Sequence, residues 1–299
     1  MFYTQASKGM SAVKSIGAEL VYLGYGRHGA AMNMAIDEAM MRHAEKERKF
    51  FIRFYDFSRP TVVLATSDSA KNIKNTDAGI EFTRRVSAGK PIYIDDNVLS
   101  YSITGPAGHE QVKDPVVTHY YLGSATAEAL EATIGSGHRI ELGSAPTGKI
   151  PYSIRAAGGE PIAGHGQFGH KGPSFLYHGV IAVGKWDAEA INSAINLKED
   201  HYRRIKALPY VSGLAGNARS VAEHKRVLMQ NMRDAFRRRF ATVSEVNAKE
   251  LSAMLAYARK ALVEGHGMGR EHGYESNEWL FRKDIALKED SSFCLLYEG

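Results

Sequence analysis

The stretch Arg84-Arg85-Val86-Ser87-Ala88-Gly89-Lys90-Pro91-Ile92-Tyr93-Ile94-Asp95 places two adjacent arginines before a turn of small residues and then an apolar strand. Small side chains let backbone N–H groups approach an anion, and guanidinium groups can bind phosphate or carboxylate through two hydrogen bonds. The same pattern also fits a hairpin with ordinary surface arginines. We treat residues 84–90, called the arginine loop below, as a candidate anion-binding segment.

A second informative segment lies further along the chain and is rich in glycine. Its glycines all fall within residues 158–179, at Gly158, Gly159, Gly164, Gly166, Gly169, Gly172 and Gly179. Such spacing predicts hairpins and loops, and loops of this kind often enclose substrates.

Composition describes an ordinary globular protein. The chain has 299 residues, of which 44% are hydrophobic and 24% are charged, and this is enough to bury a full core. We find neither an apolar run of the roughly 20 residues that a membrane helix needs nor a secretory signal pattern. The sequence therefore predicts a cytoplasmic protein that does not enter a membrane.

The pattern of predicted elements indicates an α+β protein. Residues 19–25 alternate like a strand, 32–48 repeat apolar residues at helical spacing, and 50–66 read as a strand, a turn and a second strand. Residues 91–104 add strand sequence, Ser220 opens a helix with a capping box, and 248–264 form a last helix. We expect a mixed β-sheet with helices packed on one face.

Charge is unevenly distributed around a net value of +5. Residues 201–240 contain ten lysines and arginines against two acids, which indicates either an acidic partner or a solvated helix face. Stacking aromatics are not interleaved with these cations, so a nucleic-acid partner is not expected. The single cysteine, Cys294, lies five residues from the C-terminus and cannot form an internal disulfide.

Five motifs, in order, resemble the lipoate-protein ligase A and octanoyltransferase family. The arginine loop is similar to the family's RRxSGGGAVYHD. The other four are Asn33-Met34-Ala35-Ile36-Asp37-Glu38-Ala39-Met40, residues 51–64 (FIRFYDFSRPTVVL), Pro161-Ile162-Ala163-Gly164-His165-Gly166-Gln167 followed by Tyr177-His178-Gly179, and Tyr274-Glu275-Ser276-Asn277-Glu278-Trp279. The resemblance covers about residues 18–283 and implies a fold shared with biotin-protein ligases. We expect residues 1–245 to form the catalytic or binding domain and residues 246–299 a helical segment that closes the same domain.

The resemblance implies a substrate class and a partner. Family members either activate a medium-chain acid such as lipoate or octanoate with ATP, giving an acyl-adenylate such as lipoyl-AMP, or pass the acyl group through a cysteine. The acceptor is a lysine of a lipoyl domain. Long ligases continue into a small accessory domain where this chain ends about 20 residues after Trp279, so we expect a ligase activity here to need a separate accessory protein.

Site residues follow from the matched motifs. Arg85 stands at the nucleotide-binding arginine, and His178 is expected near the adenylate as a catalytic residue, although a strand histidine bonded to backbone is the alternative. The remaining predicted binding residues are Arg84, Ser87, Gly89, Lys90, Pro91, Ile92, Tyr93, Gly164 and Gln167.

Departures from the family pattern bear on catalysis. The family's catalytic lysine falls on Pro161, which offers neither charge nor donor. The preceding ligase aspartate falls near Ser153, which argues against a Mg²⁺ ligand there, and no metal site is predicted. Lys90 is the candidate replacement cation, because a flexible lysine can reach a phosphate from a new position; Lys149 and Lys171 are weaker candidates. Cys294 matches no transferase cysteine motif.

Three functions remain open at this level. The chain is expected to bind lipoate or octanoate as the adenylate and transfer it to a lipoyl domain. The alternatives are a non-catalytic relative that binds lipoate or a lipoyl domain, and an octanoyl or lipoyl transferase.

Overall fold

The fold was analysed in a computed structural model that describes residues 15–74, 79–89, 91–135, 137–143, 153–156, 159–195, 199–264 and 272–280. Lys90, Lys149 and Cys294, which carried sequence predictions, lie outside these residues.

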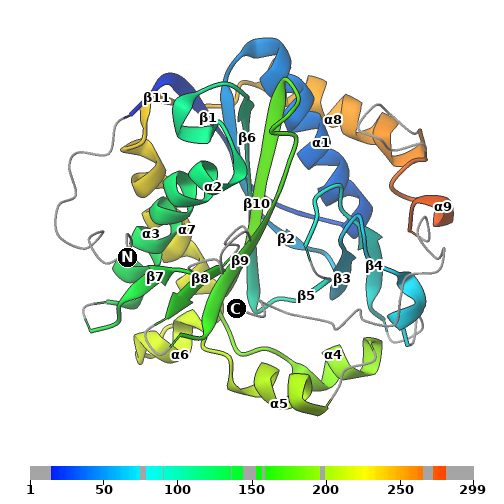
Figure 1. The fold of residues 1–299 in the computed structure, drawn as a ribbon, viewed down its shortest axis with the longest axis vertical. Coiled ribbons are helices and arrows are strands. Elements are labelled where there is room, and N and C mark those ends of the chain that lie inside the picture. Colours follow the sequence, from blue (N-terminus) through cyan, green and yellow to red (C-terminus); the bar gives the residue numbers. More distant parts are fainter. Residues whose placement is uncertain are drawn as a thin grey trace.

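Two β-sheets organise the described part of the chain (Figure 1). An eight-stranded mixed sheet has the order β11-β1-β2-β6-β10-β9-β8-β7, and a three-stranded sheet has the order β4-β3-β5. The strands of the large sheet are β1 (Ile16–His28), β2 (Phe50–Phe57), β6 (Val98–Pro106), β7 (Ile140–Leu142), β8 (Ser153–Ala156), β9 (Pro161–Phe168), β10 (Ser174–Ala182) and β11 (Phe240–Glu245). Those of the small sheet are β3 (Thr61–Leu64), β4 (Glu81–Arg84) and β5 (Ile92–Ile94).

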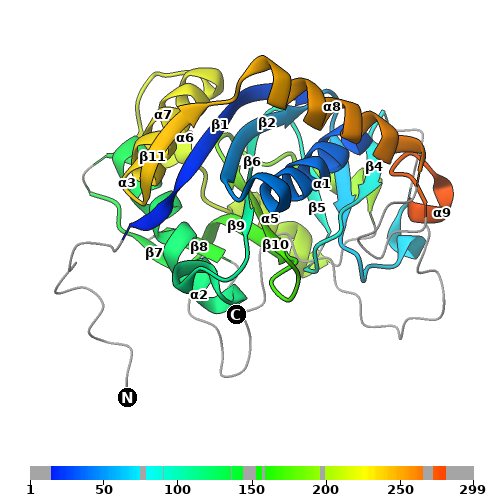
Figure 2. The ribbon, with the colours of Figure 1, turned by 90° about the horizontal axis from the view of Figure 1, so that it is seen from above.

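Helices cover both faces of the large sheet. The α-helices of the described residues are α1 (Ala30–Glu47), α2 (Pro115–Thr118), α3 (Ser124–Ile134), α4 (Ala188–Ala194), α5 (Glu199–Ala207), α6 (Val211–Ala215), α7 (Val221–Arg237), α8 (Ala248–Val263) and α9 (Asn277–Leu280), with a π-helical turn, His119–Gly123, between α2 and α3. One core packs α1 and α8 against the sheet, and a second core packs α3 and α7 against the other face (Figures 1 and 2). The predicted mixed sheet with packed helices is confirmed, but the expectation that the helices would lie on one face is wrong.

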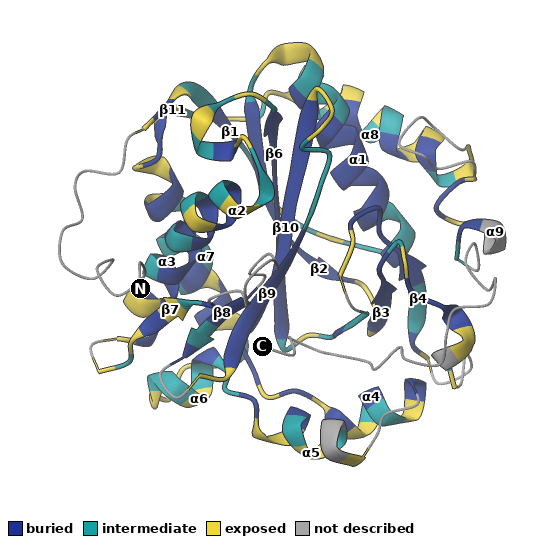
Figure 3. Cartoon of the chain, in the orientation of Figure 1, coloured by how far each residue is buried: buried dark blue, intermediate teal, exposed yellow. Residues whose placement is uncertain are grey.

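Helices lie on both faces of the large sheet because its central strands are apolar on both sides. Every residue of β2, β6 and β10 is buried (Figure 3). Along β2, Phe51 faces the α1 core whereas Phe50 and Ile52 face the α3 core, as the twofold period of a strand requires. A sheet with two apolar faces needs a layer of helices on each.

Strands that follow one another in the chain are divided between the two sheets at two places. β2 and β3 are consecutive in the chain, yet β2 pairs with β1 and β6 while β3 pairs with β4 and β5. Likewise, residues 91–104 are not one strand but β5 in the small sheet and the first part of β6 in the large one. The small sheet therefore projects beside α1 and carries the arginine loop between β4 and β5.

Helix α7 begins as the sequence predicts. The Ser220 side chain accepts from the Glu223 backbone N–H, and the Glu223 side chain accepts from the Ser220 backbone N–H, which completes the capping box. Among the described residues, no helix combines the length and apolar character needed to cross a bilayer.

Candidate functional site

The arginine loop starts where β4 ends and is tied to the end of β3. The Arg85 backbone N–H donates to the Leu64 carbonyl at 2.9 Å, and the Thr66 N–H donates to the Ser87 carbonyl at 3.0 Å. The Arg85 side chain is 8% exposed and donates to the carbonyls of Val63 and Ala88 and to Ser87 Oγ. These bonds fix the guanidinium against the loop backbone.

The absence of a side chain at Gly89 provides the space that the Arg85 guanidinium occupies. Its φ of +120° favours glycine, and a Cβ at this position would lie 2.8 Å from Arg85 Nη2. The small-residue turn seen in the sequence therefore accommodates the arginine side chain.

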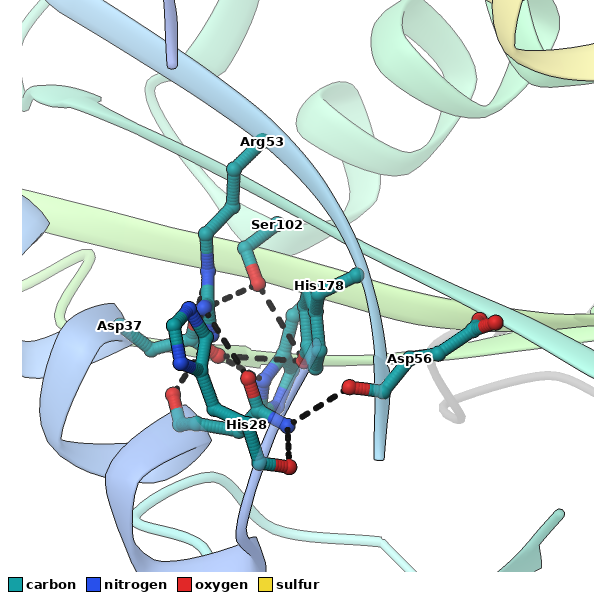
Figure 4. A network of polar contacts seen from close by, with 8 residues as sticks. His28, Asp37, Arg53, Asp56, Ser102 and His178 are labelled. Carbon is teal, nitrogen blue, oxygen red and sulfur yellow. Dashed lines mark hydrogen bonds and ion pairs between the residues drawn. The ribbon is translucent and has the colours of Figure 1, made fainter. Parts of the chain in front are cut away.

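A buried ion pair faces the loop from the large sheet and α1. Asp37 of α1 accepts from Arg53 of β2, with Oδ1 3.0 Å from Nε and 2.6 Å from Nη2. Arg53 also donates to the Asn33 side chain and backbone carbonyl, and Ser102 Oγ donates to Asp37 at 2.6 Å (Figure 4). Sequence reasoning assigned no role to Asp37 or Arg53, although both stand in matched motifs. The signal available was a charged residue in an otherwise apolar pattern.

His178 joins this ion pair to the arginine loop. Its Nδ1 lies 3.1 Å from Asp37 Oδ2, and its Nε2 lies 2.6 Å from Ser87 Oγ. The contacts thus form one chain of hydrogen bonds from Arg53 through Asp37, His178 and Ser87 to Arg85, which we call the relay. The structure brings together three predicted site residues, Arg85, Ser87 and His178, that come from two different sheets.

The neighbours of His178 settle its tautomer. Asp37 is ionised and can only accept, so Nδ1 carries the proton, and Ser87 Oγ donates to the free Nε2 while accepting from Arg85 Nε. Burial lowers the pKa of His178, against the raising effect of Asp37, which keeps the ring neutral. Burial would raise the pKa of Asp37, but Arg53, His178 and Ser102 outweigh it and hold that pKa below its usual value.

Asp37, His178 and Ser87 have the hydrogen-bond order of a nucleophilic triad. However, Ser87 is completely buried, and its hydroxyl oxygen is already bonded to both His178 and Arg85. A substrate carbonyl has no approach to this oxygen in the observed arrangement. The relay is therefore a device that fixes the arginine loop, not an exposed nucleophile.

Gly166 of β9 closes over the contact between Ser87 and His178. A Cβ at Gly166 would lie 2.7 Å from Ser87 Oγ and 3.3 Å from His178 Nε2. Gly166→Ala is therefore expected to push these atoms apart, lower the free energy of unfolding by about 1 to 3 kcal/mol, and shift the His178 ring signals in NMR. Gly17→Ala is the control, because its Cβ would meet no atom of the described residues within 4 Å. Unchanged His178 signals in Gly166→Ala would contradict the relay.

The other predicted site residues are distributed differently. Gly164 lies on the same face of β9 as Gly166, whereas Gln167 lies on the opposite face and bonds to the Pro115 carbonyl and to His170. Pro161 is buried and begins β9, paired with Arg155 of β8.

Most of the remaining predicted site residues belong to the strands that flank the arginine loop. Ile92 and Tyr93 pair with β3 in the small sheet, directly after Pro91. The Arg84 side chain is completely buried and binds the carbonyls of Ala65 and Asp68. Lys171 is exposed.

A second buried polar cluster lies on the other face of β10. His165 of β9 and His119 of the π-helical turn are in contact, with Nε2 of the first 2.5 Å from Nδ1 of the second, and the Tyr177 ring packs against His165. Burial lowers the pKa of His119 to about 4 and that of His165 well below its ordinary value. Sequence patterns do not indicate this pair, since the two residues are 46 positions apart.

Two of the ten cations of the 201–240 stretch are buried in ion pairs, so they belong neither to a solvated nor to a partner-binding face. Lys225 is buried against Asp56 at 2.7 Å, and Arg239 is buried against Glu128 at 2.5 Å. Arg237 is exposed, and Arg238 pairs with Glu128 at the surface. Charge counting cannot separate buried ion pairs from surface charge.

Within the described residues, no group of three or more His, Cys, Asp and Glu side chains is placed to hold a metal ion.

Two solved structures share the fold of this chain. A bipartite lipoate protein ligase from Thermoplasma acidophilum, solved in a study of the ligase and its E2 lipoyl domain, has a TM-score of 0.65 at 18% identity and covers 95% of this chain and 99% of that one. Lipoate-protein ligase A bound with ATP has a TM-score of 0.64 at 18% identity and covers 89% of this chain and 99% of the other. The fold is that of the lipoate-protein ligases.

The family follows from the sequence itself. Residues 29–241 match the lipoyl protein ligase A/B catalytic domain, and the chain belongs to that family. It is also similar to the octanoyltransferase LipM of Brevibacillus brevis, with 24% identity over 279 residues that cover 87% of this chain and 90% of the relative.

Proposed function

We propose that this protein binds a lipoyl or octanoyl group as its adenylate beside the arginine loop and transfers the acyl group to a lysine of a lipoyl domain. The observation that carries the proposal is the relay, which holds Arg85 in place through Ser87 and His178. A fixed guanidinium beside a small-residue turn suits a phosphate that must be neutralised without reorganisation.

Each residue of the relay has a part in this function. Arg85 supplies positive charge to the phosphate of the adenylate. Ser87 and His178 orient the Arg85 side chain, and Asp37 keeps the proton on Nδ1 of His178. The adenylate supplies the leaving group: the neutral lysine amine attacks the acyl carbonyl, the bond between the acyl carbon and the phosphate oxygen breaks, and AMP leaves with that electron pair. The nitrogen then releases one proton to water, which leaves the amide.

The relatives support the same substrate class. One is named for octanoyl transfer, one was solved with ATP, and one was studied with its E2 lipoyl domain. Octanoyl transfer from a thioester remains the second candidate because of the first of these relatives. A Mg²⁺ ion would enter with ATP, and we assign it no ligand in this chain.

The direct test is to incubate the protein with a lipoyl domain and to weigh the acceptor by mass spectrometry. Three donors separate the candidates: lipoate or octanoate with ATP and Mg²⁺, preformed lipoyl-adenylate, and an octanoyl thioester. If lipoyl-adenylate is the only donor that supports transfer, formation of the adenylate from lipoate and ATP would be assigned to an accessory protein. If no donor modifies the acceptor but calorimetry detects lipoyl-adenylate binding, the protein is a non-catalytic relative. The absence of both transfer and adenylate binding would refute the proposal.

Lys90 remains the proposed substitute for the lysine replaced by Pro161. A charge-assisted contact to the phosphate contributes about 1.5 to 3 kcal/mol, which corresponds to roughly ten- to a hundredfold in affinity. Lys90→Ala is therefore expected to weaken binding of a non-hydrolysable lipoyl-adenylate analogue by that factor. Lys149→Ala and Lys171→Ala should have little effect. Equal affinities for the original protein and Lys90→Ala, measured by calorimetry, would end the idea of a relocated cation.

A further inference from the structure

Arg84 and Arg85 are adjacent, yet their side chains take part in different structures. Arg85 belongs to the relay, whereas Arg84 points the other way, as successive residues of an extended chain do. Its Nη1 donates to the carbonyls of Ala65 at 2.6 Å and Asp68 at 2.8 Å, in the turn after β3. Arg84 thus fastens the start of the arginine loop to the end of β3.

The same guanidinium holds the segment near the end of the described chain. Arg84 Nε donates to the carbonyls of Trp279 at 3.1 Å and Leu280 at 3.0 Å, and Nη2 donates to the Leu280 carbonyl at 2.7 Å. In return, the Trp279 indole N–H donates to the Arg84 carbonyl at 2.9 Å. Side chain and backbone of Arg84 are therefore both bound to residues 195 or more positions later, and α9 lies beside β4 (Figure 1).

The reciprocal contact is completely desolvated. Arg84 has no exposed surface and Trp279 is 2% exposed, with Tyr274 packed edge-on against the indole at 5.9 Å. A buried carbonyl or guanidinium N–H that loses its partner costs about 1 to 3 kcal/mol, and more when the group is charged. Release of Trp279 would leave such groups unsatisfied at the first residue of the arginine loop.

Residues 272–280 are in turn anchored to α8. The N–H groups of Tyr274 and Glu275 donate to the carbonyls of Ala261 and Leu262 at 3.1 and 3.0 Å. Gly273 permits this close approach, since a Cβ there would collide with the Leu262 carbonyl oxygen. The segment thus runs from the end of α8 to the base of the arginine loop.

We infer that residues 272–280 act as a clasp on the arginine loop, with Arg84 and Trp279 as positioning residues for Arg85. The clasp holds Arg84 from one side while the relay holds Arg85 from the other. In functional terms the inference rests on the proposed role of the loop. Under this inference, part of the predicted closing segment, residues 246–299, orders Arg85, the proposed adenylate-binding arginine.

The test uses Trp279→Phe, which keeps an aromatic ring in the core but removes the indole N–H that donates to the Arg84 carbonyl, together with part of the ring volume. Amide hydrogen exchange of residues 84–89 should become about tenfold faster, together with that of residues 272–280, while exchange in β1 and β2 stays unchanged. Gly273→Ala, which displaces the segment from its other end, should produce the same local pattern. Trp186→Phe is the matched control, because this buried tryptophan donates no hydrogen bond from its indole N–H to any of the described residues.

Unchanged exchange in residues 84–89 of both Trp279→Phe and Gly273→Ala would overturn the clasp. So would a uniform increase throughout the protein, which would mean that Trp279 only stabilises the fold. Calorimetry of lipoyl-adenylate binding separates this inference from the proposed function. A local loosening in a protein that never binds the adenylate supports the clasp and refutes the function. A local loosening with a weakened affinity supports both.

Discussion

Asp37→Ala is expected to lower the free energy of unfolding by about 3 to 5 kcal/mol, because it leaves the Arg53 guanidinium buried without its counter-ion. The Arg53 and Asp37 side chains are only 5% and 3% exposed, and Asp37 also accepts from Ser102 and His178. Urea unfolding followed by circular dichroism measures the change. In NMR spectra of the folded variant, the His178 ring signals should also shift, because the Nδ1–H loses its hydrogen-bond acceptor.

Two further variants make this result interpretable. Asp96→Ala removes the carboxylate of the surface pair with Arg27, in which the Arg27 and Asp96 side chains are 47% and 74% exposed, and should cost at most about 1 kcal/mol. The double variant Asp37→Ala with Arg53→Met removes both buried charges and should be less destabilised than the sum of the two single variants. Equal costs for Asp37→Ala and Asp96→Ala would show that the buried pair of Asp37 and Arg53 contributes no more to stability than a surface pair.

Acid is expected to destabilise the protein in a pH range that belongs to the buried histidines. The pKa of His119 is about 4 in the folded state against an ordinary value of 6.5, so the unfolded chain binds more protons between these values. Its contribution to stability is therefore complete above pH 6.5 and is lost as the pH falls toward 4. For His119 alone the loss amounts to about 3 kcal/mol. Urea unfolding measured at several pH values tests this.

His119→Asn is the appropriate comparison, since its amide retains a polar group toward His165 but does not titrate. Stability of this variant should fall less steeply between pH 6.5 and 4. Asp37 does not interfere, because its pKa lies below 3.8 and its contribution is lost only at more acidic pH. Parallel curves for the original protein and the variant would mean that His119 is not the group that titrates.

The sequence allowed the α+β class, the capping box of α7 and the family to be predicted, because each depends on local patterns. It also indicated Arg85, Ser87 and His178 through motifs, although their contacts join two sheets. What it could not provide was the direction of each side chain. Arg84 and Arg85 look equivalent in the sequence, and only the course of the backbone between β4 and the loop sends one guanidinium to Trp279 and the other to Ser87.

The same limit explains the residues that were missed. Asp37 sits on a helix whose other buried residues are mostly apolar, and its partner Arg53 lies in a strand between phenylalanine and isoleucine neighbours. Lys225 and Arg239 were counted with the surface charges, although both are buried in ion pairs. In each case the partner lies in another secondary-structure element, and the periodicity of one element carries no information about it.

The position of β11 has a consequence for how the chain folds. β11 (Phe240–Glu245) lies parallel to β1 (Ile16–His28), with Leu20 opposite Val243, so the edge of the large sheet joins segments that lie far apart in the chain. Loop closure over such a distance is slow, and β1 keeps an unpaired edge until β11 has been synthesised. During translation this exposed edge is open to pairing with another chain, and chaperone binding there would protect the nascent sheet.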